Sequence, residues 1–183
     1  MEEQKRKKLC FVSTVQITME WFILPIAKHL AESGYDVTLV STMDKAFKQK
    51  VSGFAKTYDL TMKRGGANPF KMLSLISKLR KFFKKEKFDV VEYATPNASF
   101  YASIAARQAG IKIRNYNQWG IRYVSASGLS RFLLKRIEKM TCRYSTNVRA
   151  QSPKNMEFGI SEGLYKRNKV KVLGIGGTVG VVL

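Results

Sequence analysis

Residues able to contact sugars and phosphates gather where two predicted strands end. The first group, Glu92, Thr95 and Asn97, lies at the end of the β-branched run 89–93 and in the break after it. The second group, Gln118, Trp119 and Arg122, follows the run 111–117. A half-buried carboxylate can act as a base or bind a hydroxyl, an indole ring offers a stacking surface, and a guanidinium matches the geometry of a phosphate. The presence of these side-chain types at two neighbouring strand ends favours a binding site there.

Each of these residues also has a simpler interpretation. Glu92 is equally compatible with a salt bridge to one of the many lysines, and Trp119 with a place in the core. Arg122 and Arg149, both at strand ends, are compatible with phosphate binding or with ordinary surface charge. The catalytic residue stays unassigned at this stage.

The residues that position these groups form a predicted strand–helix–strand unit over residues 88–124. Pro96 fits the first position of a helix, and small and apolar residues recur at helical spacing from Ala98 to Ala109, where Gly110 ends the pattern. In open α/β sheets, ligands bind beyond the carboxyl ends of the strands. The site is therefore expected at the ends of these two strands.

The remainder of the chain repeats this alternation. Strands are predicted at 9–15, 36–41, 55–62, 144–150 and 169–173, and helices from about Trp21 to Ser33 and at 44–54, 70–87, 129–143 and 153–162. Residues 16–18 and 63–69 are predicted loops, and Pro25 requires the first helix to begin close to Trp21. The pattern predicts one α/β domain over 1–183, Rossmann-like and doubly wound, with a mainly parallel sheet and helices on both faces.

Composition limits the partners. The chain has 183 residues, 33 basic and 13 acidic, with a formal net charge of +20. Such an excess implies an anionic partner, either a phosphate-bearing molecule or an anionic membrane surface. No apolar run approaches the length of a transmembrane helix, and the N-terminus lacks a signal-peptide cleavage site. Cys10 and Cys142 are predicted to be buried, reduced thiols in a cytosolic protein.

Several chemistries find little support in the sequence. The single histidine, His29, falls in a predicted helix, and neither an Asp-x-Asp motif nor a nucleophile elbow is present, so no metal site is predicted. There is no P-loop sequence, and the glycine-rich segment 174–180 is predicted to be a crossing loop rather than a dinucleotide-binding turn. No zinc-finger, RRM or KH signature is present, so nucleic acid is not expected as a partner.

The helix predicted at 70–87 is amphipathic and strongly basic. Solvated surface charge is the common explanation for such a helix. The basic cluster Arg80, Lys81, Lys84 and Lys85, beside Phe82 and Phe83, also suits a surface that binds anionic headgroups, where each cation contributes on the order of 1 kcal/mol.

Residues spread along the chain resemble the N-terminal half of a family 4 glycosyltransferase, of the bacterial type that builds capsular or other surface polysaccharides. The resemblance covers about Lys8 to Val182 and is carried by KLCFVSTV, WFILPIAKHL, GYDVTLV, KFDVVEYATPNASFYASIAARQAGIKIRNYNQWGIRYV, IEKMTCRYST and NKVKVLGIGGTVGV. It implies one half of a GT-B fold, in which two Rossmann-like domains face each other across a cleft.

The resemblance also implies a division of roles. This half would bind the acceptor, often a lipid-linked glycan, through Gln16, Glu92, Thr95, Asn97, Gln118, Trp119 and Arg122. Arg149, Gly176 and Gly177 would contact phosphate or the donor. The nucleotide sugar would be held mainly by a C-terminal domain or a partner subunit, with no metal and no other cofactor, in a retaining reaction at the cytoplasmic face of the membrane.

The sequence departs from the family pattern at several places. The loop after the first strand lacks the usual glycine pair, and Tyr93–Thr95 and Gln118 stand where many members have histidines. Residues 177–182 lack the asparagine and aspartate of the usual entry into the second domain. Because no donor domain follows, the chain alone is expected to be inactive. The alternatives are a subunit of a split transferase, a truncated product, or a non-catalytic basic module that binds anionic lipid or polysaccharide.

Overall fold

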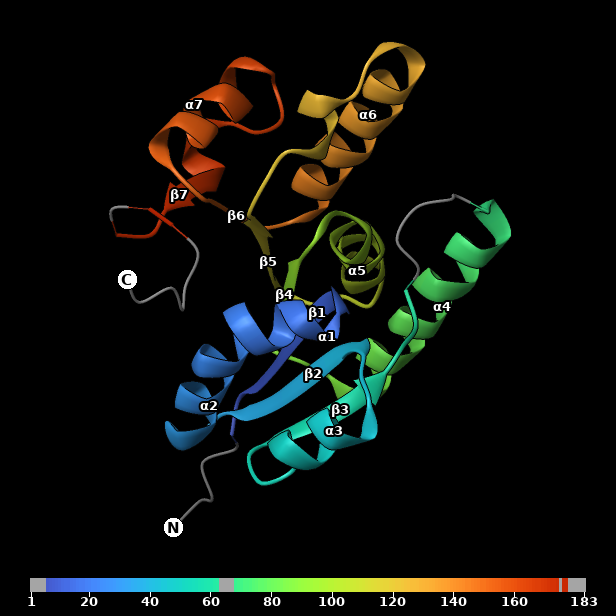
Figure 1. The fold of residues 1–183 in the computed structure, drawn as a ribbon, viewed down its shortest axis with the longest axis vertical. Helices are drawn as coiled ribbons and strands as arrows, with labels where there is room; N and C mark the ends of the chain where they lie inside the picture. Colours follow the sequence, from blue (N-terminus) through green and yellow to red (C-terminus); the bar gives the residue numbers. More distant parts are fainter. Residues whose placement is uncertain (1–5, 63–67, 175, 178–183) are drawn as a thin grey trace.

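The computed structural model describes residues 6–62, 68–174 and 176–177, which form a parallel seven-stranded sheet with helices on both faces (Figure 1). The strands are β1 (Lys8–Val15), β2 (Asp36–Thr42), β3 (Ala55–Asp59), β4 (Val90–Ala94), β5 (Ile113–Gln118), β6 (Asn147–Ala150) and β7 (Val170–Val172). The main helices are α1 (Gln16–Thr18), α2 (Leu24–Glu32), α3 (Lys45–Val51), α4 (Pro69–Glu86), α5 (Pro96–Gln108), α6 (Gly128–Tyr144) and α7 (Pro153–Ser161). The predicted Rossmann-like α/β class is confirmed.

The strand order, β3-β2-β1-β4-β5-β6-β7, places a topological switch point between β1 and β4. From β1 the chain moves outward to β2 and β3, then returns to β4 and moves the other way. Each strand pair is parallel, with Phe11 in register with Glu92, and Glu92 with Asn115. The loops at the carboxyl ends of β1 and β4 therefore diverge, which opens the crevice where α/β proteins bind ligands.

One face of the sheet is fully covered. Helices α4, α5 and α6 pack on it through a large apolar cluster that includes Leu79 and Phe83 of α4, Ala102 of α5 and Cys142 of α6. In Figure 1 these three helices lie on the same side of the sheet, and α7 adds partly buried apolar side chains to the cluster. Small residues along α5 allow it to approach the sheet closely, as its helical alanine spacing predicts.

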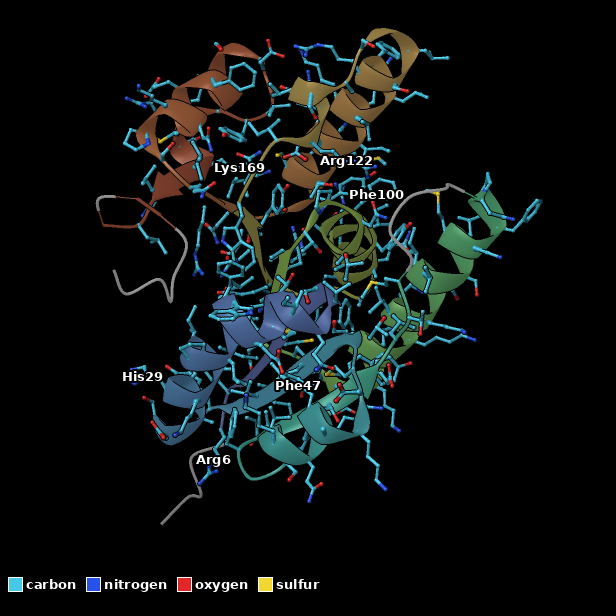
Figure 2. All side chains as sticks on the ribbon, viewed as in Figure 1. Arg6, His29, Phe47, Phe100, Arg122 and Lys169 are labelled. Atoms are coloured by element: carbon cyan, nitrogen blue, oxygen red, sulfur yellow. The ribbon has the colours of Figure 1, made fainter. Side chains whose placement is uncertain are left out.

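The opposite face is covered over only part of its width. Phe11, Leu39 and Ala55 of β1, β2 and β3 form an apolar cluster with α2 and with α3, whose Phe47 is labelled in Figure 2. Among the described residues, no side chain of β4, β6 or β7 belongs to this cluster. The strands β4 to β6 instead present polar side chains on this side, which we call the open half-face: Glu92, Asn115, Asn117, Asn147 and Arg149.

The first helical segment differs from the prediction and explains how Pro25 is accommodated. Helix begins at Gln16, directly after β1, rather than near Trp21. A π-helical turn, Met19–Ile23, joins α1 to α2, with the Leu24 N–H bonded to the Met19 carbonyl five residues earlier. Because the wider turn precedes it, Pro25 lies in the first turn of α2, where its missing N–H is tolerated.

Other boundaries shift by a few residues. β3 ends at Asp59 instead of residue 62, and α6 continues to Tyr144, which leaves β6 to begin at Asn147. The short 3-10 turns Arg122–Ser125 and Arg167–Lys169 precede α6 and β7. Residues 63–67 of the predicted loop, and 175 and 178–183 of the glycine-rich end, lie outside the described residues.

Candidate functional site

The turn from β4 into α5 is strained and is held against the end of β1. Thr95 has a φ of +67°, a conformation that non-glycine residues rarely adopt. Its hydroxyl oxygen accepts a hydrogen bond from the Thr14 backbone N–H at 3.1 Å, and the two threonine hydroxyls lie 2.7 Å apart. Strain that is fixed by such contacts is commonly found at binding sites. Thr95 is thus held at the switch point, and its role in acceptor binding stays a prediction.

Gln16 links the end of β1 to the start of α3. Its Oε1 accepts from the Asp44 N–H at 2.8 Å, and its Nε2 donates to Asp44 Oδ2 at 3.1 Å. Asp44 in turn caps α3 by accepting from the Phe47 N–H, and this bond, followed by the one from Gln16, lowers the pKa of the Asp44 carboxyl. The Gln16 amide therefore joins two loops beside the switch point.

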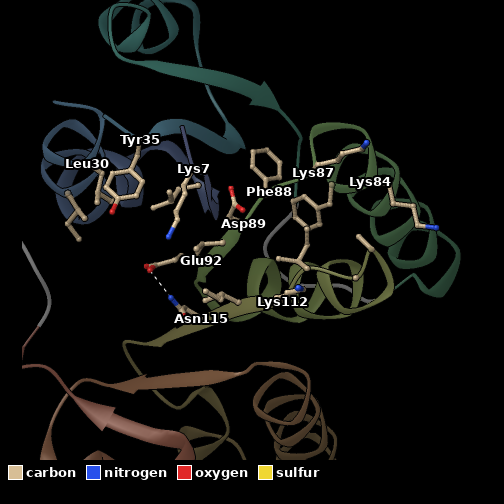
Figure 3. Close-up of a pocket in the computed structure, with 18 of the residues that line it drawn as sticks. Lys7, Leu30, Tyr35, Lys84, Lys87, Phe88, Asp89, Glu92, Lys112 and Asn115 are labelled. Atoms are coloured by element: carbon tan, nitrogen blue, oxygen red, sulfur yellow. Dashed lines mark hydrogen bonds between the residues drawn. The ribbon is translucent and has the colours of Figure 1, made fainter. Parts of the chain in front are cut away.

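Two adjoining cavities border the open half-face, and the larger one extends around the sheet to Phe83 and Lys84 of α4. The larger, about 900 Å³, lies toward the amino ends of β1, β4 and β5 and is shown in Figure 3. The smaller, about 400 Å³, lies toward the carboxyl ends. Glu92 and Arg149 line both cavities, so this pair forms the floor between them.

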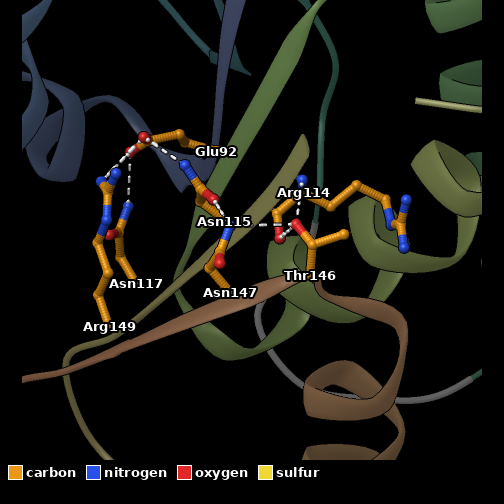
Figure 4. Close-up of polar contacts among 7 residues, drawn as sticks. All are labelled: Glu92, Arg114, Asn115, Asn117, Thr146, Asn147 and Arg149. Atoms are coloured by element: carbon orange, nitrogen blue, oxygen red, sulfur yellow. Dashed lines mark hydrogen bonds and ion pairs between the residues drawn. The ribbon is translucent and has the colours of Figure 1, made fainter. Parts of the chain in front are cut away.

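Glu92 is held by three neighbours on the same face (Figure 4). Its oxygens accept from Asn115 Nδ2 at 3.0 Å, from Asn117 Nδ2 at 3.2 Å and from Arg149 Nη1 at 2.8 and 2.9 Å. The salt bridge considered from the sequence is thus real, but its partner is an arginine rather than a lysine. Since both carboxylate oxygens are occupied, Glu92 positions Arg149, whose side chain is one-third exposed.

Five of the predicted site residues converge on the smaller cavity. Its walls include Glu92, Trp119, Arg149, Gly176 and Gly177, together with apolar side chains of β1 and α2. The Trp119 ring packs at 5.2 Å from that of Phe22, which fixes the indole at the cavity wall. An indole face beside a guanidinium can hold a sugar ring and a phosphate together.

The glycines of this cavity have positive φ angles and close contacts. Gly176 and Gly177 have φ of +102° and +106°, and the Gly177 N–H donates to the Gln151 carbonyl at 2.7 Å. A Cβ on Gly176 would lie 2.9 Å from that carbonyl oxygen. Glycine is therefore required at 176 for the chain to cross over the end of β6.

Asn97 and Arg122 lie elsewhere, at a crevice of about 160 Å³ between α4, α5 and α6. Arg122 Nη1 donates to Asn97 Oδ1 at 3.4 Å, and Met72, Phe100, Leu134 and Ile137 supply apolar walls. Figure 2 labels Arg122 and Phe100 in this region. The predicted acceptor residues are therefore not gathered in one place, since Asn97 and Arg122 lie apart from Glu92 and Trp119.

Gln118 does not reach either cavity. Its side chain is fully buried, with Nε2 donating to Glu138 and Oε1 accepting from the Tyr165 hydroxyl at 2.9 Å. Tyr116 also donates to Glu138, at 3.0 and 3.2 Å. Burial raises the pKa of Glu138, and burial together with this carboxylate raises the pKa of Tyr116. Gln118 thus serves the core, because residues 117 and 118 point to opposite faces of the sheet.

Asn115 and Asn117 are the site residues that sequence reasoning missed. Both are buried and both donate to Glu92. The signal available was their alternation: two asparagines two residues apart on a strand share one face. Polar residues at such positions in a central strand indicate either a bound ligand or a buried polar network.

The remaining predictions concern surface and reactive groups. Arg80, Lys81, Lys84 and Lys85 are all exposed on the second half of α4, and Lys84 borders the larger cavity. Cys10 and Cys142 are free and buried, as predicted. Across residues 6–62, 68–174 and 176–177, no three His, Cys, Asp or Glu side chains gather as a metal site would need, and no helix is both long and apolar enough to span a bilayer.

Comparison with known proteins identifies relatives. The family described as "Glycosyl transferase 4-like" matches residues 8–152. The capsular polysaccharide biosynthesis glycosyltransferase CapM of Staphylococcus aureus is 33% identical over 152 residues, which are 83% of this chain and 39% of CapM. The chain thus spans well under half of that relative.

Solved structures share the fold. A UDP-GlcNAc 2-epimerase from Methanocaldococcus jannaschii aligns with a TM-score of 0.69 at 20% identity, over 92% of this chain and 45% of the epimerase. MurG of Acinetobacter baumannii aligns with a TM-score of 0.60 at 18% identity, over 93% of this chain and 45% of MurG. At these identities the likeness supports the fold alone.

Proposed function

The chain belongs to the glycosyl transferase 4-like family, and from this premise we propose that it is the acceptor-binding domain of a sugar transferase in surface polysaccharide synthesis. The observation that carries the proposal is the convergence of Glu92, Trp119, Arg149, Gly176 and Gly177 on one cavity beside the switch point. The family and the capsular relative supply the chemistry that these residues would serve.

In this proposal the cavity orients a glycan that carries a phosphate group. The exposed part of the Arg149 guanidinium binds the phosphate, while Glu92, Asn115 and Asn117 fix the direction in which the guanidinium points. Trp119 stacks on a sugar ring. Glu92 is a positioning residue rather than a base, since its oxygens are already bonded. The acceptor hydroxyl oxygen bonds to the anomeric carbon of the donor sugar, the bond from that carbon to the nucleoside diphosphate breaks, and the hydroxyl proton passes to the departing phosphate.

The donor nucleotide sugar is bound by a second domain or a partner subunit, with no metal and no further cofactor, in a retaining reaction. The partial coverage of CapM and of the aligned structures supports this division. Because transfer needs donor and acceptor in near-attack geometry, the chain alone would not catalyse it. The reaction takes place in the cytoplasm at the inner membrane face, where Arg80, Lys81, Lys84 and Lys85 attract anionic headgroups.

Tryptophan fluorescence tests the acceptor site directly. The chain has two tryptophans, so a Trp21→Phe variant leaves Trp119 as the reporter. It is titrated with decyl-diphosphate-linked hexoses and N-acetylhexosamines, and separately with the corresponding UDP-sugars. Saturable changes in Trp119 emission with at least one decyl-diphosphate sugar, and weaker responses to UDP-sugars, are expected.

An unresponsive Trp119 across the whole panel would overturn the acceptor assignment. The second candidate function, a non-catalytic basic module that binds anionic lipid or polysaccharide, is favoured by the net charge of +20. It predicts binding of dextran sulfate with steep salt dependence and no response of Trp119 to any sugar of the panel.

A further inference from the structure

Most of the large apolar side chains that are exposed gather near the beginnings of two helices. Of the ten large hydrophobic residues exposed among those described, six belong to α4, to α6 or to the turn before α6. Phe70 is 82% exposed and Leu129 is 73% exposed. A single exposed apolar residue is common on protein surfaces, whereas a group of them indicates an interaction surface. We call this set the two-helix tip: Phe70, Leu73, Val124, Leu129, Phe132 and Leu133.

The two parts of the tip belong to one region of the molecule. Met72 of α4 and Leu134 of α6 line the same crevice, so the helices that carry the tip flank it from both sides. In Figure 1 the first turn of α6 lies at the end of the molecule opposite to the N-terminus, and the first turn of α4 projects from the right-hand edge of the same half. On each helix the exposed residues follow helical spacing: 70 and 73 on α4, and 129, 132 and 133 on α6. Each helix therefore presents an apolar stripe outward.

The charges around the tip are mostly positive, and the nearby carboxylate of Glu162 is paired with Lys135 of α6 at 2.7 Å. Lys71 and Lys78 of α4 and Arg136 and Lys139 of α6 are exposed, and the Arg136 guanidinium lies 5.1 Å from the Phe132 ring centre. The only acidic residue of α6, Glu138, is buried in the Tyr116 network, and that of α4, Glu86, is the last residue of its helix. Exposed apolar side chains surrounded mainly by cations match the interface of an anionic bilayer.

We propose that the two-helix tip inserts into an anionic membrane surface, with Phe70, Leu129 and Phe132 among the acyl chains and the neighbouring cations at the headgroups. A second copy of the chain fits poorly, because pairing this surface with itself would bring like charges together. Insertion would place the crevice with Asn97 and Arg122 at headgroup level. The proposal rests on the membrane association included in the proposed function. It assigns that association to an apolar surface at the beginning of α4, whereas the basic cluster Arg80, Lys81, Lys84 and Lys85 lies toward the end of that helix.

Vesicle binding of the full chain tests the proposal. Co-sedimentation is measured with vesicles of 30% phosphatidylglycerol in phosphatidylcholine, and with phosphatidylcholine alone. The variant Phe70→Ser/Leu129→Ser/Phe132→Ser should lose roughly tenfold or more in affinity for the anionic vesicles. The matched control, Ile17→Ser/Trp21→Ser, removes exposed apolar residues outside the tip and should bind like the wild type.

Insertion depth separates the tip from the basic cluster. In a Trp21→Phe/Trp119→Phe background, Phe132→Trp should show a blue-shifted emission that brominated lipids quench, whereas a tryptophan in place of Lys81 should not be quenched. Circular dichroism confirms that each variant folds. Equal binding by the tip variant and the wild type, equal loss in the control variant, or a wild type that forms dimers through the tip and ignores vesicles would each overturn the proposal. No sugar is involved, so the outcome is independent of the Trp119 titration.

Discussion

Two buried glutamates on opposite sides of the sheet have different kinds of hydrogen-bond partners for their carboxylates. Glu92 is 8% exposed, and its carboxylate is bonded to the Arg149 cation and two asparagine amides. Glu138 is 6% exposed and is bonded by neutral groups of Tyr116 and Gln118, with no ion pair among the described residues. Only Glu92 borders cavities on the open half-face, next to a cation with exposed surface.

The comparison teaches that burial of a carboxylate does not by itself indicate a site. The neighbouring groups make the difference: a partly exposed cation beside a cavity can contact a ligand, whereas buried hydroxyl and amide donors stabilise the core. The Glu138 network should therefore respond to substitution in stability, and the Glu92 network in both stability and binding. The predictions below separate these outcomes.

The largest expected effect concerns the Gln118–Glu138 network, on the face of the sheet covered by α4, α5 and α6. A Cβ on Gly159 would lie 2.1 Å from the Tyr165 hydroxyl, which must reach Gln118. Gly159→Ala should displace Tyr165 and lower the free energy of unfolding by about 3 kcal/mol. Urea denaturation measures the change, and Ser161→Ala, exposed on the same turn of chain, serves as the control with little effect. A Gly159→Ala variant as stable as the wild type would contradict this prediction and would show that Tyr165 can shift without loss of stability.

On the open half-face, the expected loss is somewhat smaller. Arg149→Met leaves Glu92 charged and largely buried without its cation, which should lower the free energy of unfolding by about 2 kcal/mol because the pair is partly solvated. The double variant Glu92→Gln/Arg149→Met should recover most of that loss. A double variant as unstable as the single one would argue that Arg149 acts through packing instead.

Tyr116→Phe removes one neutral donor from Glu138. The expected loss is about 1 kcal/mol, the usual contribution of a hydrogen bond to a buried acceptor. The same denaturation experiment in a Glu138→Gln background gives the coupling between the two residues. If the loss is the same in both backgrounds, the hydroxyl and the carboxylate are not coupled.

The smallest expected effect is the change with pH in the stability that Glu138 contributes. Burial raises its pKa in the folded protein above the ordinary value of 4.5, so the folded state retains a proton that the unfolded state releases. Stability due to this group therefore falls as the pH rises from below 4.5 through the raised pKa. Glu138→Gln keeps an oxygen acceptor without the charge, and its stability relative to the wild type should increase between pH 4 and pH 8. A constant difference over that range would contradict a raised pKa.

Much of the fold could be predicted from local patterns. Alternating apolar runs and amphipathic helices indicated a parallel α/β sheet, and Gly110 and Pro96 marked the ends of α5 correctly to within a residue or two. The π-helical turn before Pro25 could not be predicted, because the proline pattern alone suggested a shorter helix.

The site was predicted in its residue types but not in its partnerships. Glu92 and Arg149 are 57 residues apart, and only the register across β4, β5 and β6 brings them together. Gln118 was predicted to belong to the site, but its side chain is buried in the core, and it is the neighbouring Asn117 that faces the cavity. The two-residue period of a strand separates them, but it can be applied only once the open face is known.

One measurement tests the central claim most directly: decyl-diphosphate sugar binding, followed by Trp119 emission, in Arg149→Met and Tyr116→Phe variants that each carry Trp21→Phe. Both substitutions lower stability, but only Arg149 lines the proposed acceptor cavity. The account predicts that Arg149→Met weakens binding roughly tenfold or more while Tyr116→Phe binds like its parent. Equal affinities in the two variants, whether both retained or both lost, would contradict a site on the open half-face.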